Sequence, residues 1–371
     1  MKRIYLDNNA TTALDKRVLE AMLAELEKEP ANPSSVHSFG REAKNRLQAA
    51  RRTIADYLQV KPSELFFFSS GSEALNTLLR SFSRGHIITS DIEHSAVHKT
   101  VQLLEKRAVS ATYLSTGLWG AVQPEQVRKA IRPETQLIIL SAVNSETGVK
   151  NPIEEIASIA KEASIPFIVD AVSLLGKEPF KIADGVSAIV FSAHKFHGPK
   201  GVGLAWIHPR FKWEPLITGG DQELSKRAGT ENLWAIIGCA KAIALLNQEL
   251  PEAAQRMQQL RDRFENKLQE QLPHVQINGQ GPRVVNTSNL SFLGIDGEDL
   301  LIKLDLNGLA ASHGSACSSG ALEPSRVLRN MGLSKEEAGS AIRFSLSRMT
   351  TEEEIDQAID LIVKQIKKQY E

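Results

Sequence analysis

Cysteine is scarce in this chain: only Cys239 and Cys317 occur among its 371 residues. Two cysteines cannot build the disulfide framework that is typical of small secreted domains. Net charge is missing as well, because 44 lysines and arginines balance 44 aspartates and glutamates. Without a positive field the chain lacks the usual attraction for nucleic acid or for an acidic membrane surface. We therefore expect neither as a partner.

Long apolar runs are also missing. The longest candidates, such as residues 235–246, are interrupted by Gly238 and Lys241 and fall short of the ~20 residues that a membrane-spanning helix needs. The first residues, Met-Lys-Arg-Ile-Tyr-Leu-Asp, lack the apolar core of a signal peptide. Together with the few cysteines, these absences predict a protein of the reducing cytoplasm.

What the sequence does contain is a regular α/β pattern. Between residues 66 and 207, short apolar β-rich runs alternate with helical patterns. Runs without polar alternation are typical of a mostly parallel sheet that helices cover on both faces. We therefore predict a large domain over residues 14–250, with a seven-stranded, mostly parallel sheet sandwiched by helices. Residues 1–13 and 251–371 are expected to form a smaller α+β domain. Strands are expected at 66–68, 86–89, 111–114, 137–140, 166–169, 188–191 and 202–207, and helices at 73–82, 95–106, 124–131, 153–163 and 231–249.

Two charged residues follow apolar strands of this predicted sheet. Asp170 ends the run Phe167-Ile168-Val169, and Lys195 follows the strand over 188–191. Taken alone, a lysine is usually a surface residue and a strand-end aspartate is often only a cap. Together, at the edge where ligands gather in α/β sheets, they indicate a pyridoxal phosphate site. In such a site a lysine forms the Schiff base, and an aspartate keeps the pyridine nitrogen protonated.

A phosphate-binding turn is expected where another strand leads into a helix. Ser69-Ser70-Gly71-Ser72 supplies hydroxyl groups and a glycine at that point, and the amides of a helix start attract anions. The same residues could also be an ordinary helix cap. His94 is a candidate for stacking on a ring. Its spacing to His98 could also be half of a metal site, but no third ligand accompanies them, and we expect no metal.

The stretch from Gly308 to Ala321 is unusual, since eleven of its fourteen residues are Gly, Ala or Ser. Such residues offer few side chains to hold a loop in place, so we expect a flexible loop that carries Cys317. Cys239 instead lies in an apolar helical run and is expected to be a small buried hydrophobe.

These motifs together resemble the NifS-like cysteine desulfurases of group I, within the class V aminotransferase superfamily. The resemblance runs nearly from end to end. It is carried by Tyr5–Thr12, Asn32–His37, Glu93-His94, Val169–Ala171, His194-Lys195, Arg227–Thr230, Gly314–Cys317 and Ile342–Ser345.

The resemblance implies an enzyme that uses pyridoxal 5'-phosphate to convert L-cysteine to L-alanine. The sulfur would pass to Cys317 as a persulfide, and then to an acceptor protein for iron–sulfur cluster assembly or other sulfur delivery. A homodimer is implied, because Thr230 would reach the phosphate of the neighbouring subunit. The catalytic residues would be Cys317, Lys195 and His94. The cofactor would be held by Lys195, Asp170, His94, Gly71, Ser72, Ser173, Ser192, His194 and Thr230, and the substrate by Arg343, Asn32, Asn144 and Ser145.

Three positions depart from the family pattern. Ser145 stands where the family has a second asparagine, and Ser173 stands where a glutamine donates to the cofactor's phenolic oxygen. The turn Ser70-Gly71-Ser72 is one residue shorter than usual. These changes leave two alternatives open. One is a selenocysteine lyase or another pyridoxal phosphate β-lyase on the same fold, and the other is a slow, degenerate paralogue that acts mainly by binding partners. Dinucleotide binding finds no support, because Gly201-Val202-Gly203 lacks the third glycine and the following helix.

Overall fold

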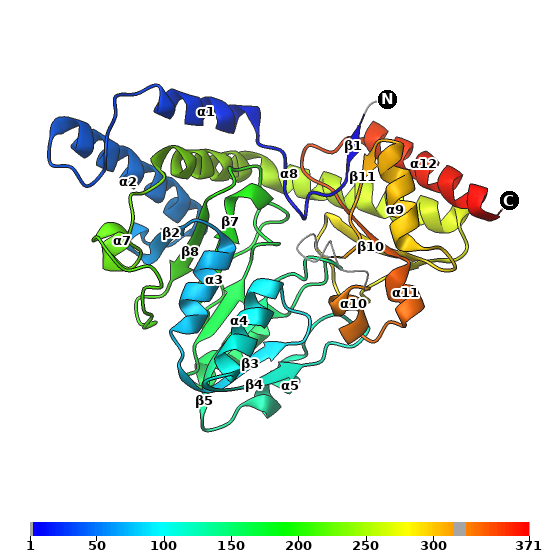
Figure 1. Ribbon diagram of the computed structural model, residues 1–371, viewed down its shortest axis with the longest axis horizontal. Coiled ribbons are helices and arrows are strands. Elements are labelled where there is room, and N and C mark those ends of the chain that lie inside the picture. The colour runs from blue at the N-terminus through cyan, green and yellow to red at the C-terminus, as the bar shows by residue number, and fades with distance from the viewer. Residues whose placement is uncertain (1–2, 315–323, 371) are drawn as a thin grey trace.

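The fold is built around one large sheet. The computed structural model describes residues 3–314 and 324–370, and its central sheet has seven strands in the order β2-β8-β7-β6-β5-β3-β4 (Figure 1). Six of them run parallel, and only β8 is antiparallel to its neighbours. The strands are β2 (Leu65–Phe68), β3 (Arg84–Ser90), β4 (Ala108–Leu114), β5 (Thr135–Ser141), β6 (Phe167–Asp170), β7 (Ala188–Ser192) and β8 (Gly203–Ile207). The predicted α/β class and the seven-stranded sheet are confirmed.

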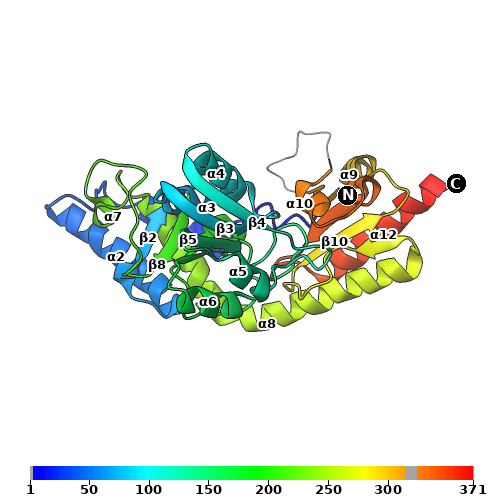
Figure 2. The ribbon, with the colours of Figure 1, turned by 90° about the horizontal axis from the view of Figure 1, so that it is seen from below.

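Helices cover both faces of this sheet, which explains why its strands are apolar throughout. In β5, Leu137 and Ile139 pack on the side of α3 and α4, whereas Ile138 and Leu140 pack on the side of α2, α6 and α8. Figure 2 shows these two helical layers above and below the sheet. The helices around the sheet are α1 (Lys16–Leu26), α2 (Ser38–Leu58), α3 (Gly71–Arg80), α4 (Ser95–Glu105), α5 (Pro124–Ala130), α6 (Ile153–Glu162) and the short turn α7 (Gln222–Ser225).

A second hydrophobic core lies beside the first and includes both ends of the described chain. Ile4 and Leu6 pack there with residues of the C-terminal third, such as Phe264, Phe344 and Ile362. Its sheets have the orders β12-β10-β9 and β1-β11. The elements are β1 (Ile4–Tyr5), β9 (Val275–Ile277), β10 (Thr287–Phe292), α9 (Gly297–Leu306), β11 (Leu309–Ala310), α10 (Arg326–Asn330), α11 (Lys335–Gly339), β12 (Ala341–Ser345) and α12 (Glu352–Tyr370).

One helix, α8 (Leu233–Gln271), connects the two cores. Its first half packs in the large core through residues such as Ile243, and its second half packs in the smaller core through Phe264 and Leu268. The predicted helix ended at residue 249, but the helix continues through Pro251. By length and composition α8 is the one described helix that could span a membrane, yet 56% of its most apolar window is buried inside the protein, as in a core helix. The domain boundary expected near residue 250 falls inside α8 and stays a prediction.

Candidate active site

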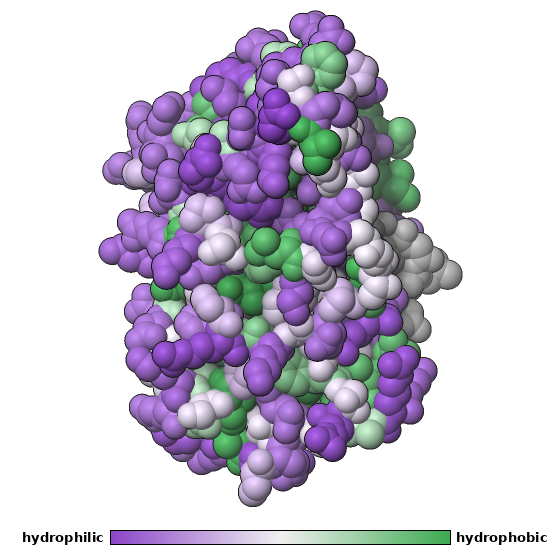
Figure 3. Space-filling model, turned by 90° about the vertical axis from the view of Figure 1, so that its left-hand side faces the viewer, coloured by the Kyte–Doolittle hydropathy of each residue, from purple (hydrophilic) through white to green (hydrophobic). Residues whose placement is uncertain are grey.

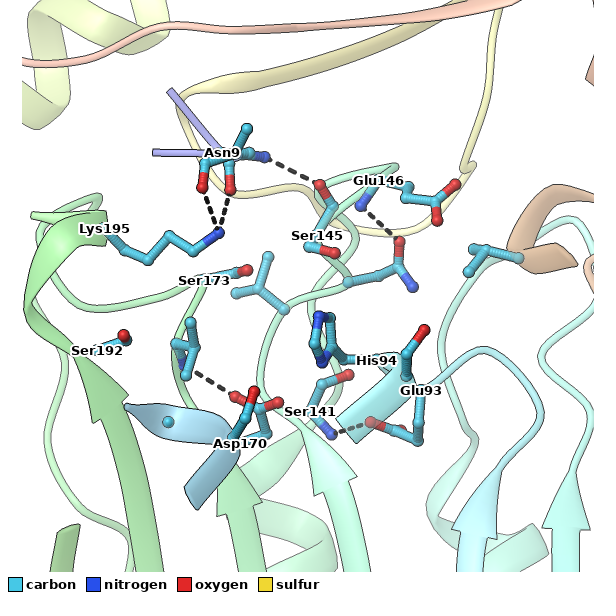
Figure 4. A pocket seen from close by; sticks show the side chains of 18 of the residues that line it. Asn9, Glu93, His94, Ser141, Ser145, Glu146, Asp170, Ser173, Ser192 and Lys195 are labelled. Atoms are coloured by element: carbon cyan, nitrogen blue, oxygen red, sulfur yellow. Dashed lines mark hydrogen bonds between the residues drawn. The ribbon is translucent and has the colours of Figure 1, made fainter. Parts of the chain in front are cut away.

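A cavity of about 210 Å³ lies at the carboxyl ends of β5, β6 and β7. In Figure 4, Asp170 lies at the bottom of the view, Lys195 at the upper left and His94 to the right. Asp170 ends β6, Lys195 follows β7 and His94 follows β3. Because these strands are parallel, their carboxyl ends lie at the same edge of the sheet. The N-terminal segment closes the opposite side through Asn9 and Ala10.

Asp170 forms the floor of the cavity. It is the last residue of β6 and is 5% exposed. Its Oδ1 accepts a hydrogen bond from the Val172 N–H at 3.0 Å, and no described group donates to Oδ2. Burial raises the pKa of this carboxyl, although the charges of His94 and Lys195 and the Val172 N–H oppose the shift. A buried carboxylate with one hydrogen bond is well suited to a cationic ring nitrogen.

The start of α3 forms an anion-binding corner. Ser70 caps the helix by accepting a hydrogen bond from the Glu73 N–H at 3.1 Å, and the Glu73 carboxylate pairs with Arg227 at 2.8 Å. The neighbouring strand β8 approaches very closely, because a Cβ at Gly203 would lie 2.2 Å from the Ser70 carbonyl carbon. Gly71 and Ser72 line the cavity at this point, where helix amides attract a phosphate.

Lys195 ends the 3-10 turn η2 (Ala193–Lys195), directly after β7. Its Nζ donates hydrogen bonds to two main-chain carbonyls of the N-terminal segment, those of Asn9 and, at 3.0 Å, Ala10. The lysine amine is therefore held across the cavity by uncharged acceptors (Figure 4). Asn9 is itself fixed by hydrogen bonds to Thr287 and to the Ser145 carbonyl.

A second lysine lies behind the first. Lys177 is 2% exposed, and its Nζ donates to the Lys195 carbonyl at 2.9 Å. Burial, followed by the charge of Lys195, lowers the pKa of Lys177 to about 7. Gly176 packs so tightly on Phe196 that a Cβ there would lie 2.5 Å from the Phe196 Cβ. Gly176 and Lys177 thus support the turn that carries Lys195, on the side of the turn away from the cavity.

His94 is the N-cap of α4. Its Nδ1 accepts the Ala96 N–H at 3.1 Å, so in a neutral ring the proton lies on Nε2. The preceding residue, Glu93, is fully buried and accepts hydrogen bonds from Ser90 Oγ at 2.6 Å and the Ser141 N–H at 2.9 Å. Burial raises the pKa of Glu93 to about 7, with a further contribution from the charge of Asp170.

His194 also borders the cavity, and it is held neutral by its surroundings. Burial lowers its pKa to about 4, and the nearby charges of Lys195, Lys200 and Lys177 act in the same direction. One ring nitrogen, Nδ1, pairs with Thr11 Oγ1 at 3.1 Å. A neutral imidazole here can donate at most one N–H to an anion.

Arg343 lies on the wall toward the smaller core. It is 2% exposed on β12. Its guanidinium donates to Asp7 Oδ1 at 2.7 Å and to the Ser145 carbonyl at 3.1 Å. Asn144 lies beside it, where its side chain donates to the Ile92 carbonyl at 3.1 Å. Planar donors on this wall match a carboxylate ligand.

The structure brings most of the predicted site residues together. Eleven of them line the cavity: Gly71, Ser72, His94, Asn144, Ser145, Asp170, Ser173, Ser192, His194, Lys195 and Arg343. Asn32 and Thr230 are exposed and do not line it. Cys317 lies outside the described residues. Cys239 is buried in α8, and burial raises the pKa of its thiol to about 12, which agrees with a structural role.

Sequence reasoning missed several contributors to this site. The carbonyls of Asn9 and Ala10 carry no side-chain signal, although the motif around them was noted. Lys177 was indistinguishable from a surface lysine, because nothing in its immediate sequence reveals its burial. Arg326 borders the cavity as well. It lies far along the chain from Asp170 and Lys195, so no sequence pattern indicated a place for it at the site.

The arrangement fits pyridoxal phosphate. Asp170 offers an oxygen without a described partner at the floor, the start of α3 offers amides for the phosphate, and Lys195 offers an amine on the same cavity. Ser141 adds a further polar group, since its buried Oγ has no hydrogen-bond partner in the described structure and lies at the cavity. A purely structural pocket would not leave such groups unpaired.

Ser173 gives a direct test of this fit. Ser173→Gln is expected to tighten the binding of pyridoxal phosphate about two- to tenfold, because the longer amide supplies one more neutral hydrogen bond, worth about 0.5–1.5 kcal/mol. Titration of the apoprotein, followed by the absorption of the bound cofactor, measures the change and should also show a shifted band. Ser173→Ala is the control, because alanine has no side-chain group that could donate a hydrogen bond to the cofactor. Equal affinities for Ser173→Gln and the unmutated protein would mean that serine already makes this contact.

Comparisons with known proteins agree with this geometry. Residues 4–358 match the family described as aminotransferase class V. The chain is 42% identical to the cysteine desulfurase IscS of Dictyoglomus turgidum over 377 residues, which cover 99% of this chain and 96% of that protein. It is similar in structure to a NifS-like protein with a TM-score of 0.92 and 35% identity, over 98% of this chain and 99% of that one. A structure of SspA in complex with cysteine matches with a TM-score of 0.82 and 33% identity, over 94% of this chain and 100% of that one.

Proposed function

This chain belongs to the class V aminotransferase family, and on that premise we propose that it is a pyridoxal phosphate-dependent cysteine desulfurase, which converts L-cysteine to L-alanine. One observation carries the proposal: Asp170, Lys195, His94 and Arg343 line a single cavity. The relatives named for this activity cover almost the whole chain. The cysteine bound in the SspA structure supports the substrate class.

The residues of the cavity have separate roles in binding the substrate, attaching the cofactor and transferring protons. When bound, pyridoxal phosphate supplies an electron sink that makes the α-proton of an amino acid acidic. Arg343 binds the substrate carboxylate, and Asp7 keeps its guanidinium plane in place. Lys195 is the attachment point for the cofactor, and its amine takes up and returns the α-proton. His94 moves a second proton through Nε2.

Cys317 is proposed as the sulfur acceptor. Its thiolate attacks the substrate sulfur, the Cβ–S bond breaks, and an S–S bond forms. The electron pair of the broken bond stays on carbon, which takes up a proton and leaves as alanine, so that one cysteine and one thiol give one alanine and one persulfide. Ser325 lies eight residues after Cys317 and donates a hydrogen bond to Glu146 at the cavity wall. The chain shortly after Cys317 is therefore bonded to the cavity, which supports the assignment.

The later fate of the sulfur also belongs to the proposal. A persulfide is a carrier rather than an end product, so we propose transfer to an acceptor protein, either an iron–sulfur scaffold or another sulfur carrier. The charge balance and the two cysteines of the sequence support a cytoplasmic setting.

We propose that the enzyme works as a homodimer. Thr230 is exposed and outside the cavity, as expected if it serves the site of a second copy. Nearby elements expose large apolar side chains, among them Val36 at 87%, Phe39 at 49% and Leu224 at 68%. On the face that Figure 3 shows, green apolar residues interrupt the polar surface in several places. Sedimentation should give one dimeric species, and a fully active monomer would contradict the proposal.

Two linked measurements test the proposed activity. The holoenzyme is incubated with L-cysteine, with and without a thiol reductant, and alanine is quantified while the protein is analysed by mass spectrometry. We expect cysteine-dependent alanine, and one added sulfur atom on Cys317 that the reductant removes. A reaction with selenocysteine alone would favour the lyase alternative. Cofactor-loaded protein that makes no alanine would favour the degenerate paralogue.

A further inference from the structure

The cavity contains a second guanidinium that the roles given so far do not use. Arg326 is the first residue of α10 and borders the cavity together with His94 and Arg343. The two arginines differ in their partners. Arg343 forms an ion pair with Asp7, whereas the described structure places no carboxylate within 4 Å of the Arg326 guanidinium. Arg326 therefore brings a positive charge that no direct ion pair with another described residue neutralises.

Arg326 is held firmly in this position. Its guanidinium donates to the main-chain carbonyls of Asp91 and Glu93, the residues that lead into His94. The Asn330 amide donates to the Asp91 carbonyl at 2.7 Å. Apolar contacts add to these bonds, because Ile92 packs in one buried cluster with residues of α10 such as Val327. Within the described residues, these bonds use two of the five guanidinium N–H groups, and the other three have no partner there and can meet a ligand.

The carboxylates of Asp91, Glu93 and Glu146 act on this cation through space, without a direct ion pair in the described structure. Burial raises the pKa of Glu93 to about 7, which weakens its negative charge near neutral pH, and burial also raises the pKa of Glu146 above its usual range. Burial lowers the pKa of Arg326 itself, but an arginine stays protonated in proteins. The titratable groups that act on it electrostatically are Asp91, Glu93, His98, Tyr113 and Glu146, and His94 and Arg343 line the same cavity.

We propose that Arg326 is a specificity-determining residue that binds the ionised sulfur of the substrate. The assignment rests on the proposed function and follows from the three polar groups of cysteine. The amino group belongs at Lys195 and the carboxylate at Arg343, so the side chain is left to the wall that His94 and Arg326 form. A free thiol has a pKa near ~8.5, and a fixed guanidinium favours its anion. Serine and alanine carry no such charge and gain no ionic attraction from Arg326.

The test compares ligands rather than rates. Holoenzyme carrying Cys317→Ser, which cannot accept sulfur, is titrated with L-cysteine, L-serine and L-alanine, and the absorption of the bound cofactor reports binding. Arg326→Gln should weaken cysteine binding about tenfold, the size of one charge-assisted hydrogen bond, and change serine and alanine by less than about twofold. Arg326→Lys, which keeps the charge, should lose about threefold or less. The pH midpoint for cysteine binding should rise only in Arg326→Gln.

Asn330→Ala is the matched control, since it removes a neighbouring contact of α10 to Asp91 without changing the charge. We expect this variant to bind all three amino acids as before. Equal weakening of all three ligands by Arg326→Gln, or the same loss of cysteine binding in Asn330→Ala, would show a merely structural role and overturn the assignment. If Arg326→Gln does not fold, the assignment stands or falls on Arg326→Lys, which must keep the preference for cysteine over serine. A holoenzyme with Arg326 intact that binds serine and alanine but not cysteine would overturn the proposed function as well.

Discussion

Cys317→Ser is expected to lower cysteine-dependent alanine formation by roughly a thousandfold or more, because the hydroxyl of serine cannot replace a thiolate as the acceptor of sulfur. The variant should still bind pyridoxal phosphate and L-cysteine, since the cavity residues that hold them come from other segments. Alanine quantification, together with peptide mass spectrometry, measures both the lost turnover and the missing persulfide.

Cys239→Ala is the control for this prediction. Cys239 is the one other cysteine of the sequence and lies buried in α8, so its removal should change alanine formation by less than about twofold and cost only some stability, on the order of 1 kcal/mol for a small cavity. Undiminished sulfur release from Cys317→Ser, or a persulfide on Cys239, would refute the assignment of Cys317.

Lys195→Ala is expected to abolish the covalent attachment of pyridoxal phosphate. Borohydride reduces the bond between a lysine and the cofactor to a stable one, so the unmutated protein should carry a labelled Lys195 peptide and the variant should carry none. The amine that donates to the Asn9 and Ala10 carbonyls is also lost. We therefore expect alanine formation to fall by roughly a thousandfold or more.

Lys200→Ala provides the comparison, because Lys200 is exposed five residues further along the chain and should leave the attachment unchanged. Lys177 is the other amine near the site. Reduction that fixes the cofactor to Lys200 or Lys177 in the unmutated protein would show that the attachment point was misassigned.

The central sheet was predictable because burial on both faces leaves an unmistakable pattern. Ile138 and Ile139 point to opposite helical layers, yet both are fully buried, so the strand reads as a continuous apolar run. The same logic located Asp170 and Lys195, since charged residues directly after such strands gather at one edge.

Other parts of the site depend on contacts that local sequence does not reveal. The carbonyl of Ala10 accepts a hydrogen bond from Lys195, although the two residues are 185 positions apart in the sequence. Arg326 reaches the residues before His94 from the far end of the chain. The helix α8 continues through Pro251 because tertiary packing on both sides of the proline supports it, although a proline usually interrupts a helix.

The pairing of the N-terminal segment with β12 also determines the order of events during synthesis. Asn8 donates to the Ser345 carbonyl at 2.8 Å, and the Asn9 N–H donates to Ser345 Oγ at 2.9 Å. A chain leaves the ribosome from its N-terminus, so Asn9 is made before Ser345, its partner 336 residues further along the chain. The large sheet can fold in the meantime, but the amine of Lys195 lacks its two carbonyl acceptors until then. We expect the growing chain to acquire its cofactor only after β12 has emerged and paired with the N-terminal segment.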